Sequence, residues 1–126
     1  MGKVTAILLS ALIALPAATA SAGEGTGSFS GLKGHTAAGQ VAVVMTADGW
    51  EVHLKDDFTF DGAPDPWVGF GTSGSFAPAT DFYRLRQNTG GQVYKVPADI
   101  DPAAYDEVYI WCRQYSVPLG VARIAD

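Results

Sequence analysis

The sequence holds a single cysteine, Cys112, so no disulfide can form within the chain and apolar burial must stabilise the fold. It has no Cys-x-x-Cys-His motif, which excludes a covalently attached c-type haem. Histidine occurs only at His35 and His53, and two imidazoles with one thiol are too few for a four-ligand zinc site. Lysine and arginine are scarce, 8 residues against 13 acidic ones, which argues against nucleic acid or an anionic membrane as a partner.

One long apolar run is present, and it lies at the N-terminus. Lys3 precedes a mostly apolar segment at residues 4–18, and the small residues Ala20 and Ala22 occupy the two positions that a signal peptidase reads. The run is shorter than the ~20 residues needed to cross a bilayer, which favours cleavage over an uncleaved N-terminal anchor. We therefore predict a signal peptide at residues 1–22 and a secreted or periplasmic protein without a membrane span after cleavage.

The remaining residues, 23–126, suffice for one domain with a modest core and are too few for two. They are predicted to form short strands separated by turns. The clearest hairpin joins a β-branched run at residues 40–46 to an alternating run at residues 50–55. Between them lies Asp48-Gly49, where glycine tolerates the positive φ of a tight hairpin turn.

The rest of the chain follows the same style. A second hairpin is predicted between residues 82–85 and 92–96, and the glycine-rich residues 23–28 are predicted to be flexible. Further strands are predicted at residues 67–70, 107–113 and 120–124, with a short extended piece at 58–60 and one helical turn at 103–106, after Asp101-Pro102. About seven or eight short strands indicate an all-β domain, either an antiparallel β-sandwich or a flattened barrel.

The strand at residues 107–113 determines where the cysteine points. Alternation places Cys112 with aliphatic residues on one face, and places Tyr109 and Trp111 on the other, between Glu107 and Arg113. Those polar ends predict that the second face points outward and that Cys112 points inward. Arg113 is then a poor activator of the thiol. Tyr109 and Trp111 either serve a flat carbohydrate or protein surface, or lie under a second sheet as core.

This prediction leaves several roles open for Cys112. A lone cysteine in an exported protein is an inert buried thiol, a cofactor ligand, a link to another chain or a reactive thiol. A redox role requires that a cation, a helix N-terminus or a metal activate the thiol. Haem bound to a thiolate is one such case, and here it would be non-covalent.

A set of short motifs occurs in order along the chain. They lie at residues 35–39, 54–58, 62–65, 94–97, 105–112 and 115–122, and the fifth ends in Ile110-Trp111-Cys112. Together they resemble the DM-thirteen family over nearly all of residues 23–126. This family is a small extracytoplasmic module often found beside DOMON domains in proposed electron-transfer systems. The resemblance implies a β-sandwich-like fold and a characteristic cysteine at Cys112, used as a bare thiol or as the ligand of a prosthetic group such as haem.

The resemblance also bears on other residues. His35 matches the family motif at its position in a glycine-rich loop, which makes it the candidate second ligand or proton partner for Cys112. His53 alternates with charged residues on a solvated strand face and is assigned no role. The chain departs from the family pattern at Leu119, where an aromatic residue is usual, and at Pro66, where an aliphatic one is usual. Both departures concern packing more than the cysteine.

One acidic cluster is present, formed by Asp56, Asp57, Asp61 and Asp65. It lacks the Asp-x-Asp-x-Asp-Gly spacing of a calcium-binding loop, so turn capping by solvated carboxylates is the preferred interpretation. No nucleophile elbow or phosphate-binding glycine loop is present.

The sequence therefore predicts an exported redox or electron-transfer accessory module that works with a redox partner protein and is not a stand-alone enzyme. Its function is expected to rest on Cys112, with His35 as a possible partner. The alternative is a non-catalytic extracellular binding or adhesion module in which the cysteine is only part of the core.

Overall fold

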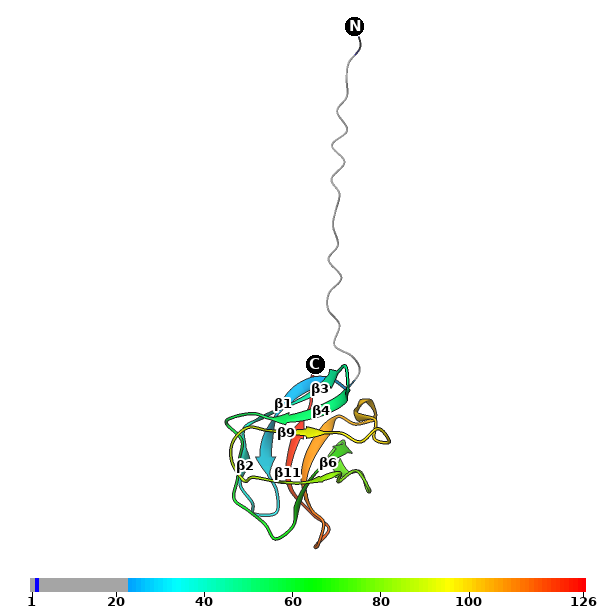
Figure 1. The fold of residues 1–126 in the computed structure, drawn as a ribbon. Helices are drawn as coiled ribbons and strands as arrows, with labels where there is room; N and C mark the ends of the chain where they lie inside the picture. Colours follow the sequence, from blue (N-terminus) through cyan, green and yellow to red (C-terminus); the bar gives the residue numbers. More distant parts are fainter. Residues whose placement is uncertain (1, 3–22) are drawn as a thin grey trace.

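The computed structural model describes residue 2 and residues 23–126, so the predicted signal peptide lies outside the described residues except for Gly2. The fold consists of short strands and one turn of 3-10 helix (Figure 1). Their bounds are β1 (Gly25–Gly31), β2 (Ala37–Ala38), β3 (Gln40–Thr46), β4 (Gly49–Leu54), β5 (Thr59–Phe60), β6 (Pro66–Thr72), β7 (Ser75–Phe76), β8 (Tyr83–Arg84), β9 (Gln92–Lys95), η1 (Pro102–Ala104), β10 (Glu107–Cys112) and β11 (Val117–Arg123). Among the residues described, no helix is long and apolar enough to cross a membrane.

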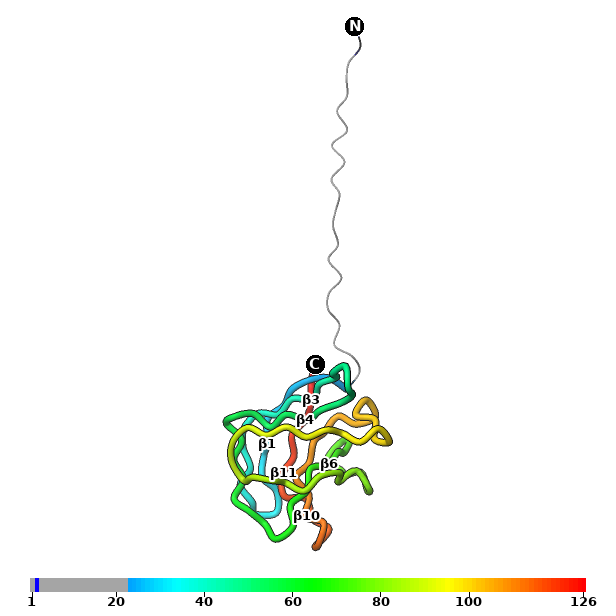
Figure 2. The backbone as a smooth tube through the Cα atoms, viewed as in Figure 1, coloured from blue at the N-terminus to red at the C-terminus, as the bar shows by residue number. Residues whose placement is uncertain are grey.

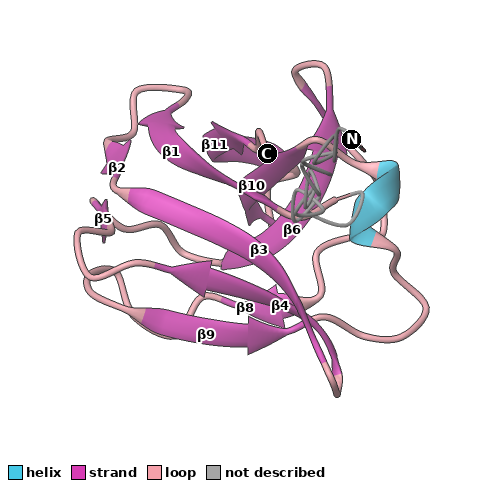
Figure 3. Cartoon of the chain, turned by 90° about the horizontal axis from the view of Figure 1, so that it is seen from above, coloured by secondary structure: helices cyan, strands magenta, loops and turns pink. Residues whose placement is uncertain are grey.

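Nine of these strands form one antiparallel sheet in the order β7-β6-β10-β11-β1-β3-β4-β9, with β8 also paired to β6. Strands β2 and β5 form a separate two-stranded ribbon. The large sheet curls around its own core (Figure 3). This arrangement confirms the predicted all-β class and the antiparallel sandwich or flattened barrel.

Strand β1 is the corner of the curled sheet. Its first half pairs with β3 and its second half with β11, so one strand serves both halves of the sheet. A Cβ on Gly25 would lie 2.5 Å from the Ala125 carbonyl oxygen, and one on Gly27 would overlap the Arg123 carbonyl oxygen. The prediction of a flexible segment at residues 23–28 is therefore wrong from Gly25 onward. Glycine allows close backbone approach at this corner.

The first predicted hairpin is confirmed. Strands β3 and β4 pair in register from Val41 with Leu54 to Thr46 with Gly49, and Gly49 has φ +118° in the turn. The predicted helical turn is also present as η1, and the Asp101 side chain accepts a hydrogen bond from the Ala103 amide.

The second predicted hairpin is wrong. Strand β8 pairs with β6, and β9 pairs with β4, so the two segments share no ladder. The path of the backbone through both segments can be followed by colour in Figure 2. The reason is side-chain bonding that strand patterns do not reveal. The Gln92 amide bonds the backbone of Gln87 and Gly90 and closes the intervening loop on itself. The Arg84 guanidinium meanwhile holds β8 beside Asp65.

Side-chain contacts, and not backbone hydrogen bonds between strands, connect the β8 and β9 regions. The Tyr94 hydroxyl accepts a hydrogen bond from the Arg86 amide, and the Arg86 guanidinium donates to the Val93 carbonyl. The same guanidinium lies 4.4 Å from the Tyr94 ring centroid and 5.1 Å from that of Tyr83. The two ends of the curled sheet are thus joined by polar and cation–π contacts.

The core fills the inside of the curled sheet, and β10 is buried on both of its faces. Inward side chains alternate along β3, β4, β6, β9 and β10, and the fully buried ones include Val41, Val52, Phe58, Val68, Tyr94, Val108, Ile110 and Leu119. On the other face of β10, Glu107 is 9% and Tyr109 1% exposed. The prediction that this face points outward is therefore wrong, because Phe76 and the turn before it fold over it.

The corner role of β1 predicts the effect of Gly27→Ala. The added methyl must displace the β11 backbone, so we expect the free energy of unfolding to fall by roughly 2 kcal/mol, as for other overpacked sites. Ser28→Ala, at the exposed neighbouring position of the same strand, is the matched control and should change it little. Equal urea midpoints for the two variants would contradict the assignment of Gly27 as a close-approach position.

Candidate functional site

Cys112 is the last residue of β10 and lies in the core. It is paired with Pro66 of β6 and with Val117 of β11, and it is 1% exposed. It belongs to the same apolar cluster as Val108 and Ile110, which confirms the predicted inward orientation. No hydrogen bond to its sulfur occurs within residues 23–126. A thiol in such surroundings is shielded from solvent and from bases.

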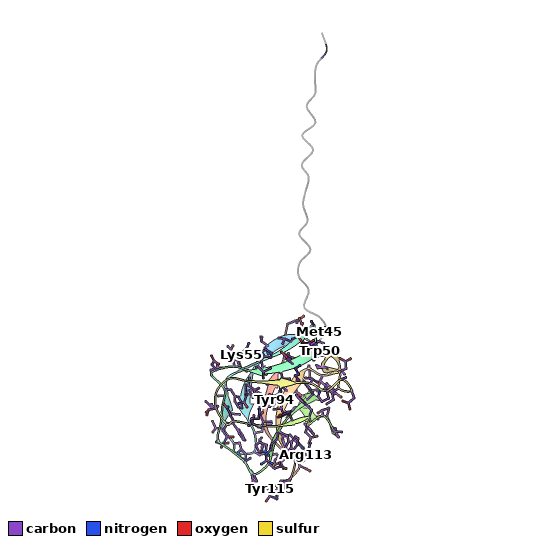
Figure 4. The ribbon with its side chains drawn as sticks, viewed as in Figure 1. Met45, Trp50, Lys55, Tyr94, Arg113 and Tyr115 are labelled. Atoms are coloured by element: carbon purple, nitrogen blue, oxygen red, sulfur yellow. The ribbon has the colours of Figure 1, made fainter. Side chains whose placement is uncertain are left out.

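The turn that follows Cys112 in the sequence is exposed to solvent. Residues 113–116 are all exposed, with Tyr115 at 61%, and Ser116 has φ +52°. Figure 4 shows Arg113 and Tyr115 at the end of the domain away from Met45 and Trp50, the residues of the β3–β4 hairpin. The thiol is therefore one residue from an exposed turn whose conformation is strained at Ser116.

Arg113 does not activate the thiol. Its Nε donates to Asp81 Oδ2 at 2.7 Å, and its Nη2 donates to the Asp81 carbonyl oxygen at 2.9 Å. Its Cζ lies 3.2 Å from the centroid of the Trp67 ring. The guanidinium is thus committed to the outer face of the sheet, as the alternation of β10 predicted.

His35 lies in the loop between β1 and β2. Its Nδ1 is 2.9 Å from Asp61 Oδ1, and its ring stacks on Phe60 with the centroids 5.8 Å apart. The bond to His35 is the largest cause that lowers the pKa of Asp61, followed by the bond to the Thr36 backbone. The contacts of His35 among the described residues lead to β5 and do not include Cys112, so a partnership of these two residues stays a prediction.

The other polar candidates have structural partners. His53 Nε2 lies 2.9 Å from Glu51 Oε1 on the outer face of β4, where alternation placed it. Asp57 accepts a hydrogen bond from the Gln40 amide. Asp65 accepts one from the Trp67 indole. These contacts agree with capping and pairing roles for the acidic residues, and no group of three or more potential metal ligands comes together within residues 23–126.

An open depression of about 840 Å³ lies where β4 ends and β9 begins. Its walls mix polar and apolar groups and do not include Cys112 or His35. The lining residues are Gln40, His53, Leu54, Lys55, Asp56, Asp57, Gly91, Gln92 and Val93.

The surroundings of Cys112 do not fit a haem. A porphyrin bound through this sulfur needs a flat space beside it, yet β6 and β11 pair on either side of Cys112, and apolar core covers its inward side. Interiors of this kind are close-packed, so a macrocycle could enter only by displacing core side chains. A bare thiol is the form of the cysteine that the fold accommodates.

An aromatic stack covers the face of β10 opposite Cys112. The rings of Trp111 and Phe76 are parallel within 7°, with centroids 3.9 Å apart, and Tyr109 meets Phe76 edge-on at 5.8 Å. The register places Trp67 of β6 directly across from Trp111. Because Tyr109 is buried and Phe76 covers one face of Trp111, these residues serve as a second packing layer, which fits the core alternative and not a flat carbohydrate platform.

Sequence reasoning missed Phe76, which lies on β7, far from β10 in the sequence but next to β6 in the sheet. The feature of the sequence that could have indicated a covering aromatic ring is the pair of glycines on β6, Gly69 and Gly71. A Cβ on Gly69 would lie 2.8 Å from the Phe76 ring, and one on Gly71 would overlap the Tyr109 ring. Alternating glycines on one strand face leave room for aromatic rings from neighbouring strands to lie flat on the sheet.

Burial is the largest cause that raises the pKa of Tyr109 to about 12, and the charge of Glu107 is the next. The Tyr109 hydroxyl donates to Glu107 Oε1 over 3.4 Å, and that oxygen also accepts a bond from the Gly74 amide at 2.8 Å. The raised pKa moves ionisation of this phenol further into the alkaline range.

Comparison with known proteins identifies one family. The family described as electron transfer DM13 matches residues 28–124. None of the curated proteins and none of the solved structures matches the chain. Both departures from the family pattern, at Leu119 and Pro66, fall at buried positions of β11 and β6. Because the match spans most of the sequence, the chain belongs to the DM13 family and is an electron-transfer-related module.

Proposed function

We propose that this protein is an exported electron-transfer accessory module in which the Cys112 thiol is the functional residue. The observation that carries the proposal is the family match over residues 28–124, which includes β10 and its cysteine. The chain offers no second thiol, so exchange at sulfur requires a second molecule, and a partner protein is the one proposed here. The predicted signal at residues 1–22 supports a secreted or periplasmic setting, where such exchange is chemically permitted.

Thiol–disulfide exchange is the reaction that a lone thiol supports. The Cys112 thiolate attacks a disulfide of the partner, the partner's S–S bond breaks, and a mixed disulfide forms. One partner sulfur leaves as a thiolate and takes up the proton that Cys112 lost. A dithiol protein that serves as the electron donor then displaces the partner from the mixed disulfide with one thiol, and its second thiol closes a disulfide on the donor and releases Cys112 in its reduced form. Two electrons thereby pass from the donor dithiol to the partner disulfide.

Access to the thiol is the requirement that the fold imposes. Cys112 is 1% exposed, but the exposed turn at residues 113–116 follows it directly. Local opening of such a turn costs less free energy than global unfolding. His35 is retained as the candidate proton partner because it matches the family motif, although its contacts are with Asp61 and Phe60.

A second function is favoured by one observation. Cys112 lies within an apolar cluster without a hydrogen bond to its sulfur among the described residues, and thiols in such surroundings are commonly inert. On this alternative the protein is a non-catalytic binding or adhesion module and the cysteine only fills the core.

Cys112→Ala separates the two functions. We expect the folded variant to lose the redox response of the wild type while its stability falls by only on the order of 1 kcal/mol, since little volume is removed. Val108→Ala is the matched control, because it truncates a buried residue on the same face of the same strand and keeps the thiol. Absorption spectrum, thiol titration and voltammetric response are compared for the three proteins. A folded Cys112→Ala protein with an unchanged redox response would contradict the thiol proposal and favour the non-catalytic binding module.

Export is tested separately. We expect the mature protein to begin within a few residues of Gly23 and to be recovered outside the cytoplasm, because the charged, apolar and small-residue segments occur in the order that a signal peptidase recognises. N-terminal sequencing after cell fractionation measures both properties. Recovery of a soluble cytoplasmic protein that retains Met1 would refute the proposed location.

A further inference from the structure

The aromatic stack on the outer face of β10 connects the surface to a buried phenol. Trp111 is partly exposed, Phe76 lies parallel to it, and Tyr109 beyond Phe76 is 1% exposed. Gly69 and Gly71 of β6 leave the space that these rings occupy. Tryptophan and tyrosine are the aromatic side chains that lose one electron most readily. Two such rings, bridged by Phe76, therefore lead inward from the surface.

A carboxylate lies at the inner end of the stack. Beside Tyr109 lies the Glu107 carboxylate, 3.4 Å from the hydroxyl, with Asp106 next to it in sequence. Beside Trp67, the cross-strand neighbour of Trp111, lies the Arg113 guanidinium, 3.2 Å from the ring centroid and paired with the Asp81 carboxylate. A cation disfavours the loss of an electron from a ring next to it, and an anion favours that loss. Because Asp81 balances the charge of Arg113, the Glu107 carboxylate is the charge that favours an oxidising equivalent on Tyr109.

A proton acceptor is in place at the inner end. A phenol that loses an electron becomes strongly acidic, so its oxidation is favourable only if a base takes the proton. Tyr109 holds its proton at neutral pH, as any phenol does, and burial raises its pKa further, to about 12. Glu107 Oε1 is the carboxylate oxygen that this hydroxyl faces. Proton transfer to a base so positioned needs little rearrangement.

We propose that Trp111, Phe76 and Tyr109 form a one-electron relay in which Glu107 accepts the proton of Tyr109. A high-potential one-electron metal oxidant on a partner protein takes an electron from Trp111 and is reduced, which leaves an indole radical cation. Tyr109 then gives one electron to that indole and its phenolic proton to Glu107. The products are a neutral Tyr109 radical, a protonated Glu107 and an uncharged Trp111. The relay rests on the proposed function only in requiring electron exchange with a partner, and it does not use Cys112.

The experiment places a photo-oxidant beside the stack in a protein that lacks the native thiol. A ruthenium polypyridyl complex is attached to the single cysteine of the Ser75→Cys, Cys112→Ala protein, since Ser75 is exposed and adjoins Phe76. After a flash with an oxidative quencher, transient absorption and electron paramagnetic resonance follow the indole and tyrosyl radicals. We expect an indole radical that decays as a tyrosyl radical forms.

Variants in the same labelled protein assign the steps. Tyr109→Phe should abolish the tyrosyl signal and leave a long-lived indole radical. Glu107→Gln should slow tyrosyl formation on the order of a hundredfold, which is the rate loss expected when a general base is removed. Trp111→Phe should remove most of the tyrosyl signal. Tyr83→Phe and Tyr115→Phe, at exposed tyrosines outside the stack, are the matched controls and should leave the signal unchanged.

Each contrary result overturns the relay. A tyrosyl signal that survives Tyr109→Phe, or a rate of tyrosyl formation that Glu107→Gln does not alter, would reduce the stack to packing alone. Near-ultraviolet circular dichroism of each variant verifies folding, and if Glu107→Gln does not fold, an unchanged tyrosyl yield in Trp111→Phe refutes the path instead. Because every protein in this series lacks Cys112, failure of the relay is distinguishable from failure of the thiol proposal.

Discussion

The pairing of β10 between β6 and β11 is the constraint on which the rest of this structure depends. With one cysteine and no disulfide, the domain is stabilised by packing, and β10 is the strand that is packed on both faces. Its inner face places Cys112 in the apolar core. Its outer face places Tyr109 and Trp111 under Phe76. One strand thus keeps a thiol and an aromatic stack apart, with the sheet between them.

Glycine makes this arrangement possible at two places. On β6, Gly69 and Gly71 let the rings of Phe76 and Tyr109 lie against the sheet. On β1, Gly25 and Gly27 let the strand turn the corner between the two halves of the sheet. A methyl group at any of these positions would meet backbone or ring atoms, so their cost in chain entropy is offset by close packing.

Turn residues and the alternation of apolar and polar residues correctly predicted the parts of the fold that depend on neighbours in the sequence. Asp48-Gly49 fixed the first hairpin, and alternation along residues 107–113 placed Cys112 inward. The errors arose where residues distant in the sequence meet. The Gln92 amide closes its own loop and so prevents the second hairpin, while Phe76 covers a strand face whose polar ends indicated solvent. The motif order identified the family and its cysteine, yet the pairing of His35 with Asp61 depends on a loop contact that no strand pattern encodes.

The central claim is that the Cys112 thiol reacts through local opening of the turn at residues 113–116, and not through global unfolding. It is tested by the rate at which Cys112 of the wild-type protein exchanges with a small aromatic disulfide, measured as a function of urea below the unfolding transition. The account predicts a rate that is nearly independent of urea, because opening the turn exposes little surface. A rate that rises from the lowest urea concentrations with the full denaturant dependence of global unfolding would contradict it and mark Cys112 as a structural residue.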